Sequence, residues 1–155
     1  MKDAKINYSE GDIVSVPLRD DSGRNGYGVI ARMDRKGKIF GYFFQPDADL
    51  SKLEPEKAIL VGKFGDLGLI ENSWSVVKKI ENWDREKWTM PPLMRIDDEA
   101  GLIFLSYYDD VTMKFVKEVK YDLNENSELK MYPQDNMMGA GSVELKITKL
   151  VNSTR

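Results

Sequence analysis

Residues 11–45, GDIVSVPLRDDSGRNGYGVIARMDRKGKIFGYFFQ, decide the fold of this chain. They predict three successive β-strands, at about 12–18, 27–34 and 38–45. The strand residues are apolar and mostly β-branched or aromatic, and Asp, Asn, Ser and Gly gather between the strands. Short apolar runs separated by such turn residues are typical of an antiparallel meander. Pro17 cannot donate a ladder hydrogen bond, so we expect it at a sheet edge or a bulge.

Downstream, the sequence predicts additions to this sheet or covers for it. Further strands are expected over 57–64, 74–80, 93–96, 102–107 and 112–121. The turn at 97–101 is expected to join two of them as a hairpin. Residues 142–151, SVELKITKLV, fit both helical spacing and strand alternation. We favour a helix there, because Gly139 and Gly141 set the segment apart and a helix would cover one face of the sheet.

We find no internal repeat, low-complexity stretch or linker, so residues 1–155 are expected to form a single domain. The predicted fold class is α+β, mainly β. It is an antiparallel twisted sheet or partly open barrel, with few short helices including a C-terminal one.

The 155 residues contain no cysteine and no histidine. Their absence removes thiolate and imidazole nucleophiles, general bases and metal ligands. A Ser-His-Asp hydrolase and an imidazole-based zinc hydrolase are therefore excluded. The groups that remain available for catalysis are carboxylates, Lys, Tyr, Ser and Thr, together with magnesium or calcium bound by carboxylates. We therefore expect that the protein is not an enzyme and that it binds no cofactor and no metal ion.

No run approaches the ~20 apolar residues that span a bilayer. The start, MKDAKINYSEGD, has no apolar signal core. We therefore expect no membrane partner and a location in the cytoplasm.

The net charge is −3, with a sequence pI of about 5.1, which does not favour nucleic acid as a partner. The acidity is concentrated in one segment. Residues 97–129 hold nine acidic residues against three lysines, a balance of −6, whereas residues 1–96 are nearly neutral.

The acidic residues Asp97, Asp98 and Glu99, and the pair Asp109 and Asp110, allow three interpretations: a carboxylate metal site, a face that docks a basic partner, or solvated turns. Two turns that flank one strand normally lie at its opposite ends, which argues against a shared metal site. Tyr107 and Tyr108 adjoin the second acidic turn, and tyrosine beside aspartate is common in polar interfaces.

Two other features have mainly structural interpretations. The Gly-rich stretch 22–28, SGRNGYG, lacks the Lys-Ser/Thr ending of a phosphate loop, so it is predicted to be a hairpin turn. Trp74, Trp83 and Trp88 lie within fifteen residues. They are expected to serve the core rather than an interface, with Trp88 the most exposed of the three.

Several segments resemble the immunity protein 26 family of bacterial polymorphic-toxin systems. Its pattern is Gly-Asp, a strand ending in Pro-Leu, a short turn, then Tyr-Gly and a hydrophobic strand. The matching stretches are GDIVSVPLRDDSGRNGYGVIARM and FGYFF, Ala58–Phe64, Trp74–Val77 with Ser75 in place of the usual Pro, Trp88–Asp97 and Gly141–Leu150. Some family members carry a phosphotriesterase label. Without histidine this chain lacks the imidazole ligands of a conventional metallo-phosphotriesterase, so that label is not carried over.

The resemblance implies an intracellular antidote that binds a cognate toxin and blocks its active site or an essential surface. Charge alone selects the expected toxin face, since many such toxins are nucleases with basic clefts. Its candidate residues are Asp97, Asp98, Glu99, Tyr107, Tyr108, Asp109, Asp110 and Trp88.

Two alternatives stay open: a small β-barrel module for a peptide or nucleic acid, and a carboxylate-dependent hydrolase that uses magnesium. The oligomeric state is left open as well.

Overall fold

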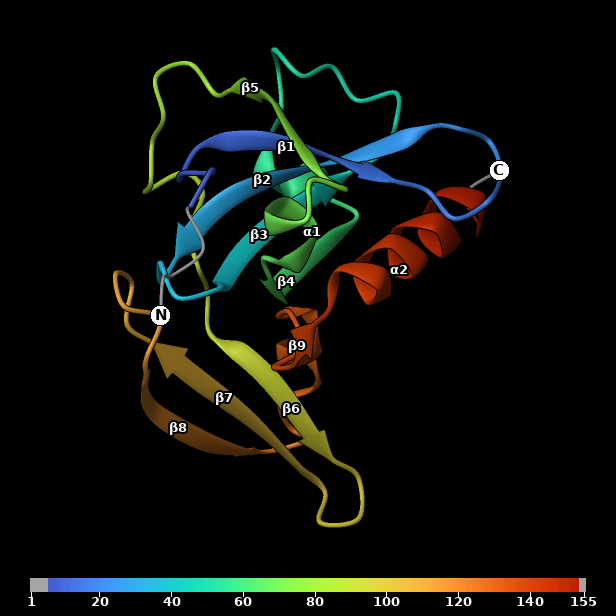
Figure 1. Ribbon diagram of the computed structural model, residues 1–155. Coiled ribbons are helices and arrows are strands. Elements are labelled where there is room, and N and C mark those ends of the chain that lie inside the picture. Colours follow the sequence, from blue (N-terminus) through green and yellow to red (C-terminus); the bar gives the residue numbers. More distant parts are fainter. Residues whose placement is uncertain (1–5, 154–155) are drawn as a thin grey trace.

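The computed structural model describes residues 6–153, which form two β-sheets and a C-terminal helix (Figure 1). Residues 1–5 and 154–155 lie outside this described part, and with them the first residues of the polar start. The predicted mainly β class with a C-terminal helix is confirmed.

The larger sheet, called the main sheet below, has six strands in the order β5-β1-β2-β3-β4-β9. Its neighbours are antiparallel except for β4 and β9, which run parallel. Because β5 and β9 are edge strands, the sheet does not close into a barrel. The strands are β1 (Asp12–Pro17), β2 (Asn25–Met33), β3 (Lys38–Phe44), β4 (Leu60–Gly65), β5 (Ser75–Lys79) and β9 (Met137–Met138).

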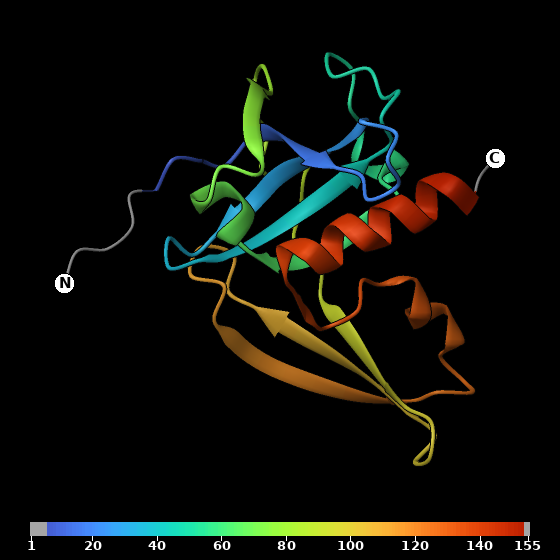
Figure 2. The ribbon, with the colours of Figure 1, turned by 45° about the vertical axis from the view of Figure 1, so that its right-hand side comes forward.

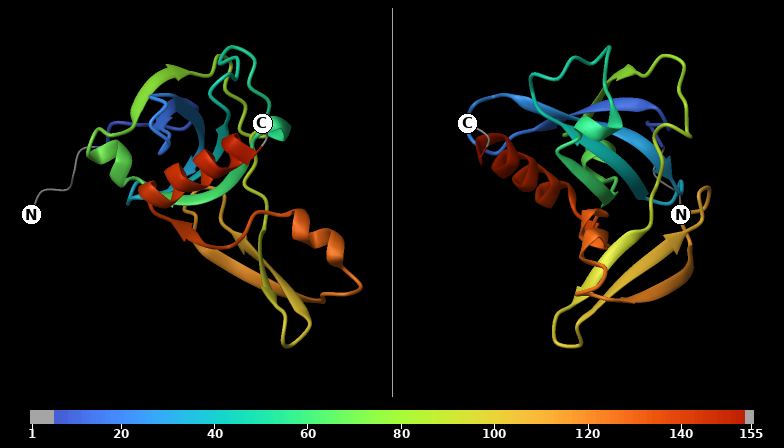
Figure 3. Two further views of the ribbon diagram at one scale, coloured as in Figure 1. Left: turned by 90° about the vertical axis from the view of Figure 1, so that its right-hand side faces the viewer. Right: turned by 180° about the vertical axis from the view of Figure 1, so that it is seen from behind.

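The smaller sheet, called the second sheet, contains β6 (Leu93–Asp97), β7 (Leu102–Tyr108) and β8 (Phe115–Asp122) in that order. The predicted hairpin across 97–101 is confirmed. These strands do not extend the main sheet, because β9 already occupies the edge beside β4. The second sheet instead projects from the main sheet, with the 97–101 turn at its free end (Figures 1 and 3).

The tail forms a helix, α2 (Ala140–Ser153), as the sequence analysis favoured. Val143, Ile147 and Val151 are buried along one side of it. Figure 2 shows α2 lying across one face of the main sheet. The remaining helices are short: α1 (Leu67–Ile70) and the 3₁₀ turns η1 (Pro55–Lys57) and η2 (Ser127–Met131).

Both faces of the main sheet are buried along its strands β1 to β3. Neighbouring residues along a strand point to opposite faces, and here both of them are covered. Val14 and Phe43 pack in the cluster under α2, whereas Ile13 and Tyr42 pack in the cluster on the other face, which loops and the second sheet cover. This explains why β1 to β3 are nearly continuous apolar runs in the sequence.

The Gly-rich stretch is a hairpin connection between β1 and β2, as predicted, and no helix follows it. Pro17 pairs only with Asn25 of β2, because β5 pairs with β1 no further than Ser15. Its missing N–H therefore leaves no gap in the ladder, and a bulge lies earlier in the strand. Gly28 is required by packing: a Cβ there would lie 2.7 Å from the ring of Phe43.

Candidate partner-binding surface

The two acidic turns lie at opposite ends of β7. Asp97–Gly101 precedes the strand at the free end of the second sheet, and Asp109–Asp110 follows it beside the main sheet (Figure 1). A strand of this length separates its ends by about 20 Å. The acidic segment 97–110 is therefore not one continuous patch.

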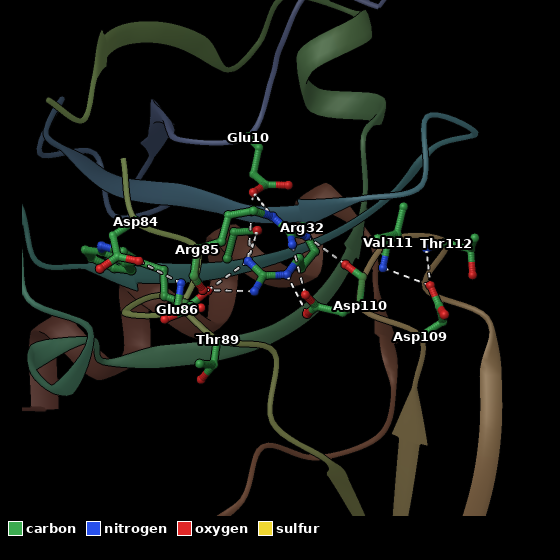
Figure 4. A network of polar contacts seen from close by, with 12 residues as sticks. Glu10, Arg32, Asp84, Arg85, Glu86, Thr89, Asp109, Asp110, Val111 and Thr112 are labelled. Carbon is green, nitrogen blue, oxygen red and sulfur yellow. Dashed lines mark hydrogen bonds and ion pairs between the residues drawn. The ribbon is translucent and has the colours of Figure 1, made fainter. Parts of the chain in front are cut away.

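Asp110 takes part in an ion-pair network that joins the two sheets (Figure 4). Its carboxylate accepts hydrogen bonds from Arg32 Nε at 2.7 Å and Arg85 Nη1 at 3.0 Å. Glu10 completes the network: Arg85 Nε donates to it, and Arg32 Nη1 lies 4.0 Å from it. The carboxylate of Asp110 is thus engaged by cations of this chain.

Arg32 is the buried centre of that network. It comes from β2, and its side chain is 3% exposed. Besides the carboxylates, its guanidinium donates to the backbone carbonyls of Ala31, Trp88 and Arg85 at 2.6–3.0 Å. The contacts with Trp88, Arg85 and Asp110 fasten β2 to the 82–92 loop and to the β7–β8 turn, so the network is structural.

Asp109 organises the turn between β7 and β8. Its Oδ1 accepts the backbone N–H of Val111 at 2.9 Å and of Thr112 at 2.7 Å. These hydrogen bonds hold the pKa of Asp109 below its usual value. Met113 closes the turn in a left-handed conformation and is buried. The sequence analysis had assigned Met113 to the following strand, which instead begins at Phe115.

Tyr108 points inward, toward the main sheet. Its hydroxyl donates to Asp135 at 2.7 Å, and Lys63 Nζ lies 2.8 Å from the same carboxylate and 4.3 Å from the tyrosine ring. Burial, together with the neighbouring carboxylate, raises the pKa of Tyr108. Burial alone would raise the pKa of Asp135, but the hydrogen bonds from Lys63 and Tyr108 outweigh it and lower that pKa. Tyr108 therefore helps to anchor the second sheet.

Tyr107 lies on the other face of the second sheet. It is partly exposed, and Lys117 Nζ lies 5.1 Å from the centre of its ring. Partial burial, and then the neighbouring hydroxyl of Tyr121, raise the pKa of Tyr107. This tyrosine remains accessible to a partner.

The expectation that Trp88 is the most exposed tryptophan is wrong. Trp88 is 2% exposed and meets Tyr42 and Phe44 edge-to-face, with ring centroids 5.3 and 5.9 Å apart. Trp83 is the partly exposed one, and it stacks on Trp88. Trp83, Trp88 and Met90 all pack in the core cluster on the face of the main sheet away from α2.

Five acidic residues gather at the free end of the second sheet, which we call the acidic tip. Asp97 is opposite Leu102, which is opposite Asp122, so both carboxylates emerge on the same face. Glu125 joins them, because its backbone N–H donates to Asp122 Oδ2 at 2.9 Å. The acidic tip comprises Asp97, Asp98, Glu99, Asp122 and Glu125.

No ion pair engages an acidic-tip carboxylate within residues 6–153. The nearest cations on that face are Arg95 and Lys120, one residue pair further along the sheet and on either side of Phe104. Arg95 covers the Phe104 ring at 4.1 Å and reaches Glu118 at 3.5 Å. The tip therefore presents uncompensated negative charge to solvent.

In the part of the chain that the structure describes, no group of three or more carboxylates is placed to hold a metal ion. Between residues 6 and 153, no helix is both long and apolar enough to cross a membrane.

Sequence reasoning missed the buried charged residues Arg32, Lys63 and Glu144. The only local signal is a single charged residue inside an otherwise apolar run, as in VIARM and LVGKF. Glu144 on α2 accepts hydrogen bonds from Trp74 Nε1 and Arg19 Nε, both at 2.7 Å. Each partner is distant in the sequence, so spacing could not identify it.

The fold is that of a mainly β-protein with two sheets, and comparison with known families is more specific. The sequence model of immunity protein 26 matches residues 9–101, which is more than half of the chain. The protein therefore belongs to the immunity protein 26 family. No curated protein and no solved structure matches it.

The matched residues extend from just before β1 to the end of the 97–101 turn. They include Trp88 and the first three acidic-tip residues, Asp97, Asp98 and Glu99. They do not include Tyr107 to Asp110, nor the tail segment Gly141–Leu150 whose resemblance was noted from the sequence. Family membership thus rests on β1 to β5 of the main sheet and on β6 of the second sheet.

Proposed function

We propose that this protein is a single-domain antidote of a bacterial polymorphic-toxin system, which binds a cognate toxin domain in the cytoplasm and neutralises it without catalysis. Family membership supports the antidote role. Blocking a toxin needs a stable scaffold and a complementary surface, and the doubly buried main sheet provides the scaffold.

The acidic tip is the proposed toxin-binding surface. Tyr107 lies toward the other end of β7 and on the opposite face of the second sheet, so it is not part of this surface. The observation that carries this choice is the contrast in pairing: Asp110 binds two arginines of its own chain, whereas no ion pair within residues 6–153 engages the tip. A basic toxin cleft would find free carboxylates there. Unpaired charges at a projecting end also accelerate encounter with an oppositely charged partner.

The test is a pull-down from lysate of the source cells with three tagged baits: the wild type, Asp98→Lys/Glu99→Lys and Glu56→Lys/Glu71→Lys. The last variant carries the same charge change at exposed sites on η1 and after α1. The proposal expects one protein captured by the wild type and the control but lost from the tip variant. Its toxic domain should stop growth when expressed alone, and co-expression of the wild type should restore growth.

Two results would contradict different parts of the proposal. If the tip variant still binds and neutralises the captured toxin, the acidic tip is not the binding surface, but the antidote role stands. Capture of only non-toxic proteins would contradict the antidote role itself.

A further inference from the structure

A hollow of about 900 Å³ opens at the other end of β7 from the acidic tip. The turn between β2 and β3 forms one wall, and residues 111–114, between β7 and β8, form the opposite wall. Figure 1 shows these two turns on the same side of the molecule, remote from α2. We call this feature the cationic hollow, after the lysines and arginines that line it.

The lining residues include six Lys/Arg and only two Asp/Glu. Two of these cations are already paired: Arg85 binds Glu10 and Asp110, and Lys79 binds Asp12 at 3.1 Å. The four others have no ion pair within residues 6–153, and they come from both walls: Arg35, Lys36, Lys38 and Lys114.

Asp34 is the nearest carboxylate in sequence to three of these four cations, and a single carboxylate cannot balance their charge. Its Oδ1 accepts the backbone N–H groups of Lys36 and Lys38 at 2.7 and 2.9 Å, which fixes the β2–β3 turn. Arg35 is exposed in this turn in a left-handed conformation, with φ of 63°. The hollow is therefore a concave, positively charged site in a chain whose net charge is −3.

The hollow also has an aliphatic component. Val111 is 70% exposed on one wall, and Met33 is half-buried on the other. No aromatic residue is among its lining residues in the described chain. Single-stranded nucleic acid is commonly held by aromatic rings that stack on bases. Cations around an aliphatic spot, without such rings, favour a peptide ligand instead.

We propose that the cationic hollow binds an acidic segment of a protein partner, with carboxylates on the four free cations and an aliphatic side chain against Val111. This surface is separate from the acidic tip and opposite to it in charge. The inference goes beyond the antidote role and does not depend on which toxin the tip recognises.

The experiment measures binding by fluorescence anisotropy with three labelled probes of matched net charge: a peptide of alternating Glu and Leu, a peptide of alternating Glu and Ser, and an oligothymidylate. The proteins are the wild type, Lys36→Glu/Lys114→Glu, Val111→Ser, and Lys130→Glu/Lys149→Glu as the charge-matched control. The control lysines are exposed on η2 and α2. Thermal denaturation establishes that each variant is folded.

The proposal predicts saturable, salt-sensitive binding of the Glu–Leu peptide that is tighter than binding of the other two probes. Lys36→Glu/Lys114→Glu should weaken it about tenfold or more, because two attractive contacts become repulsive, while the control keeps wild-type affinity. Val111→Ser should weaken binding of the Glu–Leu peptide but not of the Glu–Ser peptide.

Absence of saturable binding by the Glu–Leu peptide would overturn the proposal. So would equal losses in the hollow variant and the control, because the binding would then reflect only the protein's overall charge. Tighter binding of the oligothymidylate would also overturn it and would assign the hollow to nucleic acid.

Discussion

The two acidic turns at the ends of β7 have similar compositions and different surroundings. At the turn beside the main sheet, Asp110 binds Arg32 and Arg85, and Asp109 accepts two backbone N–H groups. At the free end, Asp97 accepts one backbone N–H, from Ala100 at 3.1 Å, and no ion pair within residues 6–153 engages Asp98 or Glu99. One turn fastens the second sheet to the main sheet, and the other presents charge to solvent.

The difference teaches that acidic content alone does not identify a binding face. A carboxylate that satisfies a buried arginine stabilises the fold and offers little to a partner. A carboxylate without a partner in its own chain keeps its full attraction for a cation elsewhere. The two turns therefore differ in whether cations of the same chain form ion pairs with their carboxylates.

The largest effect is expected at the centre of the network. Arg32→Met should destabilise the protein by about 3 kcal/mol, because it leaves carboxylates and backbone carbonyls without their buried donor. Urea denaturation followed by tryptophan fluorescence measures this change. Arg95→Met is the control: its pair with Glu118 is exposed, so the loss should stay below about 1 kcal/mol. Equal losses in the two variants would contradict a structural role for the network.

A smaller difference should separate the acidic turns themselves. Asp110→Asn is expected to destabilise the fold by about 1–2 kcal/mol, since it weakens charge-assisted hydrogen bonds to two arginines. Asp98→Asn should change stability by less than about 0.5 kcal/mol, as exposed substitutions without contacts usually do. The same urea titrations compare the variants. If Asp98→Asn destabilised the protein as much as Asp110→Asn, the two turns would not differ in their structural role.

The contacts of Asp135 with Lys63 and Tyr108 should make the free energy of unfolding depend on pH. The pKa of Asp135 is lowered in the folded protein, so the folded state binds fewer protons than the unfolded state in the acidic range. That stability is present above the unfolded value, about pH 4, and is lost as pH falls through the folded pKa. Asp135→Asn should therefore flatten the fall in stability below about pH 4, measured by urea denaturation at several pH values.

Tyr108→Phe provides the matched comparison for that prediction. It removes one hydrogen bond to Asp135 and keeps the Lys63 contact, so the flattening should be partial. A steep acid transition that survives in Asp135→Asn would show that other carboxylates control it.

Much of the fold could be predicted from local sequence. The meander over 11–45 follows from apolar runs and turn residues, and the hairpin around 97–101 follows from a polar turn between two apolar strands. The C-terminal helix was favoured over a strand because glycines isolate it, and its buried face follows the expected spacing. These features depend on neighbours within a few residues.

The partners of the charged side chains could not be predicted in this way. Arg32 and Asp110 are 78 residues apart, and Trp88 is buried by side chains of β3. A single sequence carries no record of such long-range contacts. The two acidic turns were expected at opposite ends of one strand, and β7 holds them there; charge counts nevertheless grouped their residues into one candidate toxin face.

The most direct test of the account is the association rate of the captured toxin domain with the antidote, measured by surface plasmon resonance at low and high salt. The account predicts that Asp98→Lys/Glu99→Lys lowers the rate about tenfold or more and removes most of its salt dependence, while the urea midpoint stays that of the wild type. A folded tip variant that associates at the wild-type rate, with the wild-type salt dependence, would contradict the claim that the acidic tip binds the toxin.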